Sequence, residues 1–479
     1  MKKILFFDRC DLTRLFIFLT KELSEDYNIV HVAFSQEEEN QLKEAGIEVA
    51  YNLQGELAKT LDSCALDLQK ADEIDRFIIK ESKGVFSFNA AIQADRGYVV
   101  LNNNEAMHLA QSYYMIWKKI FDSHHVDLMF HEPSSLFMVY IASLLCKKQG
   151  GQFYYMQQSG ADVRPYSFMF IDGENYLCPE FEKYYEQFKN NPDTIDVDRV
   201  KAYIDTFRKD QSVFMGNLQH ATASRFNIYL NSLKYKIKSR IKGSKFDKLK
   251  DNINYWMNNS NNIFAERLYN LKHYKARGIQ FLTSLPEGER FYYYPFHLEP
   301  EATVTYLGGG IYTNQVKLIE NIAASIPPGT FLYVKDHPHE YAYRNAEDYY
   351  RLMQIPNIRL IHQSIPGKVL VNKAIGVFTI NGTAGVEALM IGRKVYCFAP
   401  NFYSFYEGVK FIPNVKDIRE IVYADFGREV KDDMNFYAYV NAYLNANHPG
   451  FAAYFYLAVE SEIDEQENAR NIAEAIRAI

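Results

Sequence analysis

Short apolar runs alternate with amphipathic, helix-compatible stretches from the first residues of the chain. Apolar runs bounded by turn residues are typical of buried strands, and their alternation with helical patterns is typical of a parallel sheet with crossover helices. The pattern predicts a helix over residues 135–147 and strands over residues 3–7, 28–34, 46–51, 127–132 and 152–158. The first part of the chain is therefore expected to form one Rossmann-like half.

A second alternating set begins at Phe291. It predicts strands over residues 291–296, 330–338, 358–362, 374–382 and 394–400. A helix between the first two of these strands is expected to start at Thr313 as N-cap and to end at Pro327, because proline cannot continue a helix. This second set predicts another Rossmann-like half, so the fold class is α/β with two such domains.

The stretch between the two halves is long, polar and helix-compatible, with few strand signals. We expect an N-terminal Rossmann-like domain over residues 1–180, a helical insertion over 181–280, a C-terminal Rossmann-like domain over 281–460 and a closing helix over 461–479. The insertion contains a basic segment, residues 234–250, with eight Lys or Arg and one Asp. Such a segment suits either peripheral contact with anionic lipid or a solvated helix face.

Length and charge narrow the class of protein. A chain of 479 residues fits two domains with some additional structure, and a formal charge of −6 argues against a protein coated in nucleic acid. The five cysteines form no CxxC pair, which indicates a reducing compartment without a disulfide framework. Acidic and basic residues interrupt the apolar start, and the longest apolar run, residues 136–146, is shorter than the roughly 18 residues of a membrane span. We expect a cytoplasmic protein.

Polar residues that follow predicted strands are the candidates for chemistry, because ligands of open parallel sheets bind beyond the carboxyl ends of the strands. Three clusters of the second half lie there. His297 and Glu301 follow the first strand and suit a nucleotide or sugar. Lys335, His337 and Pro338 end the next strand, where Lys and His suit a phosphate.

The third cluster is a turn from strand to helix through small residues. It consists of Asn381, Gly382, Thr383, Ala384, Gly385 and Glu387. Backbone N–H groups at a helix start favour an anion, and the Glu387 carboxylate could accept hydrogen bonds from sugar hydroxyls or serve only the helix dipole. The sequence GxxxxGK[ST] is absent, so this is no P-loop.

The run YYYPFHLEPEATVTYLGGG, followed by LYVKDHP, TINGTAGVEAL and GRKVYCF, resembles the bacterial capsule polysaccharide biosynthesis family that includes Kdo transferases. The resemblance covers about residues 290–415, while the N-terminal half agrees only in layout. It implies a GT-B glycosyltransferase with two Rossmann-like domains facing a cleft. The N-terminal domain would bind a capsule or surface glycan acceptor, and the C-terminal domain a CMP-activated acidic keto sugar of the Kdo or nonulosonic acid type.

The resemblance also implies that a His-Pro motif and a Ser/Thr motif surround the CMP phosphate. The corresponding positions are His337-Pro338 and Thr383, where a single Thr between Gly and Ala replaces paired hydroxyl residues. The expected reaction is an inverting displacement in which Lys335, His337 and nearby N–H groups stabilise the departing phosphate. We expect no metal and no cofactor, since no DxD-like pair stands in a suitable place.

An inverting transfer needs a base for the acceptor hydroxyl, expected from the N-terminal domain. Glu132, after a buried strand, is the first choice, and Asp8 and Asp95 are the alternatives. Gln157, Ser159 and Arg164 follow the next strand and are candidates for binding the acceptor or the donor carboxylate.

Two other interpretations stay open. The same groups would serve a nucleoside diphosphate sugar or a CDP-polyol, because they recognise any phosphate. A non-catalytic glycan-assembly protein could also use this fold. The joint presence of Lys335, His337, Thr383 and Glu387 favours an enzyme.

Overall fold

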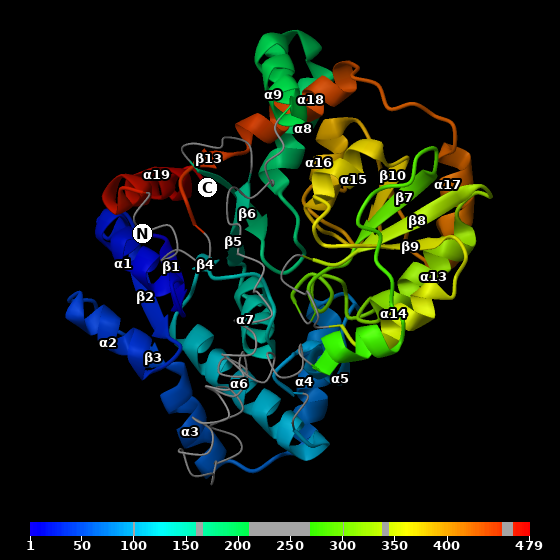
Figure 1. The fold of residues 1–479 in the computed structure, drawn as a ribbon. Coiled ribbons are helices and arrows are strands. Elements are labelled where there is room, and N and C mark those ends of the chain that lie inside the picture. Colours follow the sequence, from blue (N-terminus) through cyan, green and yellow to red (C-terminus); the bar gives the residue numbers. More distant parts are fainter. Residues whose placement is uncertain (99–100, 160–165, 210–268, 300, 338–343, 453–462) are drawn as a thin grey trace.

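The computed structural model describes the chain except for residues 99–100, 160–165, 210–268, 300, 338–343 and 453–462 (Figure 1). Its described part contains two β-sheets, each flanked by helices. One sheet is built mainly from the first part of the chain and the other from residues after 289. This confirms the predicted α/β fold of GT-B type with two Rossmann-like domains.

The N-terminal sheet has the strand order β13-β6-β5-β4-β1-β2-β3. Its elements up to residue 172 are β1 (Lys3–Asp8), α1 (Leu12–Leu23), β2 (Asn28–Ala33), α2 (Gln36–Glu44), β3 (Tyr51–Asn52), α3 (Leu53–Ser63), α4 (Leu68–Glu81), α5 (Phe88–Ala94), α6 (Asn103–Ser123), β4 (Leu128–Phe130), α7 (Phe137–Lys148), β5 (Gln152–Ser159) and β6 (Ser167–Asp172). The strands from β3 to β5 are parallel, whereas β6 and β13 (His448–Pro449) add antiparallel pairs at one edge.

The C-terminal sheet has the order β12-β11-β10-β7-β8-β9 and is parallel throughout. Its elements are β7 (Arg290–Pro295), α13 (Gln315–Ser325), β8 (Thr330–Lys335), α14 (Ala346–Met353), β9 (Ile358–Ile361), α15 (Gly367–Lys373), β10 (Gly376–Thr379), α16 (Ala384–Ile391), β11 (Lys394–Cys397), β12 (Val409–Phe411), η4 (Val415–Asp417) and α17 (Ile418–Asp425). This is the doubly wound order, in which the chain direction across the sheet reverses between β7 and β10.

Several predicted elements differ from the structure in extent. The third strand, expected over residues 46–51, is only the two-residue β3, because Gly46 has a positive φ of 75° and ends α2 in a turn. The N-cap of α13 is Asn314 and not Thr313, since the Asn314 side chain accepts the Lys317 N–H at 3.0 Å. Strands β6, β12 and β13 were not predicted.

Helices α8 (Pro179–Asn190), α9 (Val197–Lys209) and α18 (Met434–Asn445) bridge the two sheets at the top of Figure 1, and the 3-10 helix η2 (Pro192–Thr194) joins α8 to α9. Tyr185 of α8 donates a hydrogen bond to Asn435 at 2.7 Å, and Arg208 of α9 pairs with Asp432. The described part of the expected insertion is therefore helical and packs on α18 and α16. The basic segment 234–250 lies outside the described residues.

The chain ends on the N-terminal half. Strand β13, inside the range expected for the C-terminal domain, pairs with β6, and α19 (Glu465–Arg477) packs on α1. Arg14 donates two hydrogen bonds to Glu465, at 2.7 and 2.8 Å. The closing helix thus covers one face of the N-terminal sheet, while α6 and α7 cover the other.

The segment after β7, residues 301–311, extends from the C-terminal sheet to the N-terminal domain, and we call it the arm. Tyr306, 3% exposed, belongs to the core of the N-terminal domain and stacks near Phe86 and Tyr140. Its hydroxyl donates a hydrogen bond to the Ala91 carbonyl at 2.6 Å. The arm holds the carboxyl end of β7 against the N-terminal half.

Candidate functional site

Each sheet has one point at which the strand order reverses, between β1 and β4 in the N-terminal domain and between β7 and β10 in the C-terminal domain. The loops beyond the carboxyl ends of these strands are the usual ligand sites of such sheets. Most of the residues predicted from sequence lie at these two points.

His297 joins the ends of β7 and β10. Its Nε2 accepts the Ile380 N–H at 2.9 Å and lies 3.2 Å from Thr379 Oγ1. Burial, with a smaller effect of His337, lowers the pKa of His297 to about 3, so the ring is neutral. Because Nε2 is an acceptor, the single ring proton is on Nδ1, which becomes a donor at any physiological pH.

Position 382, beside the His297 ring, has room only for glycine. A Cβ at position 382 would lie 2.6 Å from His297 Cε1 and 3.1 Å from Nδ1. The ring therefore packs directly on the backbone that leads into α16, and Nδ1 faces that turn.

Gln315 at the start of α13 holds the loop after β7. Its Oε1 accepts hydrogen bonds from the Tyr294 hydroxyl and the His297 N–H, both at 2.9 Å. Its Nε2 donates to the His297 carbonyl at 2.9 Å and to Glu299 at 2.6 Å. The buried amide of Gln315 thus fixes the backbone of His297 from both sides.

Lys335 is the last residue of the neighbouring strand β8, and His337 lies in the loop that follows it. Lys335 is 4% exposed, and burial lowers its pKa, while Asp336 partly opposes that shift. Arg344 pairs with Glu299 at 2.8 Å and with Asp336 at 3.5 Å, which ties the ends of β7 and β8 together. Pro338 lies outside the described residues.

The turn from β10 into α16 contains a buried amide without a partner. Asn381 is fully buried, and neither its Oδ1 nor its Nδ2 has a hydrogen-bond partner within the part of the chain that the structure describes. A buried amide without partners is costly unless a ligand or water satisfies it. The adjacent Thr383 is the N-cap of α16, but its side chain makes no cap bond, so the hydroxyl can serve a ligand.

Glu387 lies in the first turn of α16. Burial raises its pKa from 4.5 to about 7, although Lys368 acts in the opposite direction. Tyr403 packs behind the same turn, and a Cβ on Gly385 would lie 2.3 Å from the Tyr403 hydroxyl oxygen. Gly385 is therefore a packing requirement, whereas Ala384 opens the helix.

Glu132 lies at the reversal point of the N-terminal sheet, after β4. Its Oε2 is 3.4 Å from Arg9 Nη1, and its side chain keeps 16% exposure. The neighbouring His131 donates from Nδ1 to the Phe7 carbonyl at 3.0 Å, while its buried Nε2 has no partner among the described residues. A carboxylate, a guanidinium and a neutral imidazole thus meet at this point.

The two alternative carboxylates are more enclosed. The Asp95 carboxylate accepts the Gly97 N–H at 2.6 Å and the Phe137 N–H at the start of α7. Asp8 is fully buried, and its Oδ2 lies 2.9 Å from His31 Nδ1. Burial raises the pKa of each carboxyl to about 6. Each carboxylate thus already has a protein partner.

The predicted acceptor residues lie at the end of β5 and have protein partners. Gln157 accepts a hydrogen bond from the Tyr176 hydroxyl at 2.9 Å, and Ser159 contacts Ser167 and Asn447. Both side chains are buried. Arg164 lies outside the described residues.

Glu301 reaches the boundary between the halves. Burial raises its pKa, and Arg96 of the N-terminal domain opposes that shift. Burial and the charge of Arg9 lower the pKa of Arg96, while Glu132 and Glu301 oppose that shift. Charges from both reversal points therefore interact at Arg96. The sequence pattern did not predict Arg9, Arg96 or Arg344 as site residues, nor the positioning role of Gln315. Only Gln315 carried a signal, from its place at a predicted helix start.

The described residues contain no group of three or more His, Cys, Asp or Glu side chains that could hold a metal ion. Among the same residues, no helix combines the length and apolar character needed to cross a bilayer.

Residues 207–417 match the family model described as capsule polysaccharide biosynthesis protein. No curated protein matches the chain significantly. Among solved structures, the Thermosulfurimonas dismutans KpsC beta Kdo 2,7 transferase is 12% identical, covers 70% of this chain and 82% of its own, and has a TM-score of 0.34.

Two further structures are similarly distant. The UDP-GlcNAc 2-epimerase from Neisseria meningitidis is 12% identical, with 96% and 99% of the two chains covered and a TM-score of 0.27. A glycosyltransferase from Rickettsia africae is 9% identical, with 98% and 99% covered and a TM-score of 0.28. The match over residues 207–417 contains the ends of β7, β8 and β10, so the part of the chain that carries these strand ends is similar to the capsule polysaccharide biosynthesis family.

Proposed function

We propose that this chain is a glycosyltransferase that moves an acidic keto sugar of the Kdo or nonulosonic acid type from a CMP-sugar to a capsule or surface polysaccharide acceptor. The observation that carries the proposal is a set of groups that suit a phosphate at the β7/β10 reversal point and at the end of the adjacent β8. His297 Nδ1, the unpartnered Asn381 amide and the start of α16 lie at the reversal point, and the buried Lys335 ends β8.

Departure of CMP places negative charge on its phosphate. Lys335 supplies a positive charge from a buried position, and the N–H groups at the start of α16 supply oriented dipoles. His337 can donate a hydrogen bond or a proton to the leaving oxygen. These groups stabilise a monophosphate leaving group without a divalent ion, so we propose metal-independent transfer with no cofactor beyond the donor itself.

Glu132 is the proposed base for the acceptor hydroxyl. Arg9 pairs with Oε2 at 3.4 Å, and the side chain keeps 16% exposure, so the carboxylate is accessible to an acceptor hydroxyl. Asp95 and Asp8 are occupied by backbone N–H groups and by His31 respectively. Inversion then follows from attack on the face of the sugar opposite the phosphate.

The glycan acceptor of a capsule enzyme is commonly carried on a lipid, so we propose a cytoplasmic protein that works at the inner face of the membrane. The basic residues of segment 234–250 would supply peripheral contact with anionic lipid.

Thermal shift with CMP, CDP, UDP and GDP tests the donor class. We expect CMP to raise the melting temperature most, because binding to the folded state alone stabilises it. A larger shift with UDP would favour a nucleoside diphosphate sugar and overturn the CMP assignment.

Incubation with CMP-Kdo, related CMP-sugars and an acceptor panel, followed by mass analysis, tests transfer itself. His337→Ala and Glu132→Gln should each lower turnover at least about 100-fold while the protein stays folded. Unchanged turnover would remove the substituted residue from the mechanism. Loss of transfer in EDTA, reversed by a divalent ion, would contradict metal independence.

A further inference from the structure

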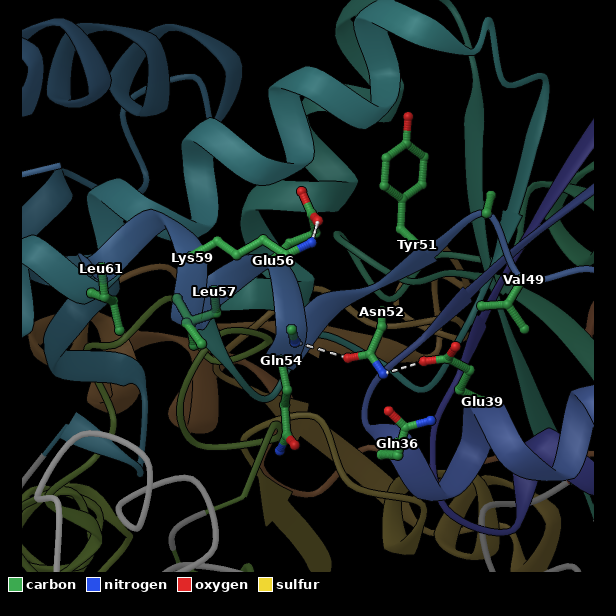
Figure 2. Close-up of a pocket in the computed structure, with 13 residues that line it drawn as sticks. Gln36, Glu39, Val49, Tyr51, Asn52, Gln54, Glu56, Leu57, Lys59 and Leu61 are labelled. Atoms are coloured by element: carbon green, nitrogen blue, oxygen red, sulfur yellow. Dashed lines mark hydrogen bonds and ion pairs between the residues drawn. The ribbon is translucent and has the colours of Figure 1, made fainter. Parts of the chain in front are cut away.

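A pocket of about 690 Å³ lies in the N-terminal domain between α2, β3 and α3 (Figure 2). Its polar wall includes Gln36, Glu39, Asn52, Gln54 and Glu56, and the half-exposed ring of Tyr51 adds an aromatic surface. This volume lies within the range of roughly 300–1,000 Å³ that is typical of small-ligand sites. None of these residues belongs to the phosphate site or to the proposed base.

The polar wall is held in place by its own contacts. Asn52 donates to Glu39 at 2.6 Å and accepts the Gly55 N–H at 2.8 Å, as the dashed lines in Figure 2 show. Hydrogen bonds from Lys43 and Asn52 lower the pKa of Glu39, and bonds from Lys119 and Lys59 lower that of Glu56. Both carboxylates therefore stay ionised at neutral pH and act only as acceptors.

The pocket adjoins the reaction centre through the strand ends. The Gln54 N–H donates to the Phe34 carbonyl at 3.0 Å, and the Phe34 N–H donates to the Asp8 carbonyl at 2.9 Å. The Arg9 guanidinium, which pairs with Glu132, lies 5.6 Å from the Phe34 ring centroid. Strands lie about 4.8 Å apart and β4, β1, β2 and β3 are successive neighbours, so β3 is separated by roughly 14 Å from β4, which Glu132 follows, a span that an oligosaccharide of a few units bridges.

We propose that this pocket binds uncharged sugar units of the acceptor glycan, remote from the hydroxyl that reacts. This inference rests on the proposed glycosyltransferase function. Fixed carboxylate and amide groups accept and donate hydrogen bonds to hydroxyls, and the aromatic ring offers an apolar face to a sugar ring. Lys43, Lys59 and Lys119 pair with the two carboxylates, so the charges of the pocket wall are matched within the protein and the wall suits neutral, hydroxyl-bearing units.

The test uses Gln36→Ala with Gln54→Ala, because neither side chain caps a helix or joins an ion pair among the described residues. Gln41→Ala on the exposed face of α2 is the matched control. With an acceptor of several sugar units, we expect the double variant to raise the acceptor KM about tenfold with little change in kcat. With a minimal acceptor, and for the donor KM, it should match the wild type.

Equal effects on long and minimal acceptors, or no effect on either, would overturn the pocket assignment. Ala58→Trp, which fills the pocket, should reproduce the length-dependent loss. If it leaves the long acceptor unaffected in a folded protein, the proposal is wrong.

Failure of the proposed function has a different signature, since the wild type would then transfer sugar to no acceptor. The pocket is in that case tested by saturation-transfer NMR with maltotriose and triacetylchitotriose. The wild type should bind at least one of them and the Gln36→Ala, Gln54→Ala variant neither. Binding of neither by the wild type, or equal binding by both proteins, contradicts the pocket proposal.

Discussion

At the scale of single residues, Gly382 and His297 form one unit. The ring of His297 occupies the space that a side chain at 382 would need, and its Nε2 bond to Ile380 N fixes the tautomer. We expect Gly382→Ala to displace the ring, to cost about 1–3 kcal/mol of stability and to weaken CMP binding. Urea unfolding and CMP titration measure both effects.

Gly367→Ala is the control for this prediction, because a Cβ there would lie 3.8 Å from the Tyr293 hydroxyl, an ordinary contact. A Gly382→Ala protein that binds CMP as tightly as the control would show that His297 Nδ1 does not contact the donor.

The buried Glu387 carboxyl should make the unfolding free energy depend on pH. Its folded pKa of about 7 exceeds the usual 4.5, so the folded state holds the proton more tightly than the unfolded state. The resulting stabilisation is present below about pH 4.5 and is lost as pH rises to 7. Glu387→Gln should match the wild type at pH 4 and exceed its unfolding free energy by about 1–3 kcal/mol at pH 8. Chemical denaturation at both values checks this, and a difference independent of pH would contradict it.

At the scale of elements, the N-cap of α13 could not be predicted from the sequence alone. Thr313 and Asn314 are both good capping residues, and only the structure shows that Asn314 accepts the Lys317 N–H. We expect Asn314→Ala to cost about 1 kcal/mol and Thr313→Ala to cost much less. Equal losses in urea unfolding would mean that the cap is shared.

Elements that depend on contacts between distant parts of the chain could not be predicted from the sequence either. The apolar runs and helical stripes of residues 291–400 were sufficient to predict the parallel sheet, because each strand is marked by its own composition. Strand β13 has two residues, and its identity as a strand depends on β6, far away in the sequence. The positions of His297, Lys335 and Asn381 at strand ends were foreseen, but the His297 tautomer and the unpartnered amide depend on contacts across strands.

At the scale of the whole molecule, two segments of the chain pass between the domains and hold them together. The arm around Tyr306 enters the N-terminal core, and the chain from α18 to α19 returns to the N-terminal sheet. Glu301 on the arm thereby lies where Arg96 affects its charge. The relative placement of phosphate site and proposed base therefore depends on packing at the boundary as much as on either domain.

Tyr306 tests this dependence. Tyr306→Phe removes only the hydrogen bond to Ala91 and should cost about 1 kcal/mol with turnover almost unchanged. Tyr306→Ala removes a buried ring from the N-terminal core and should cost about 3–5 kcal/mol. The arm then loses its contact with the N-terminal core, so we expect kcat to fall while CMP binding, proposed for the C-terminal domain alone, is retained. Parallel loss of kcat and CMP affinity would instead mean that the arm shapes the donor site directly.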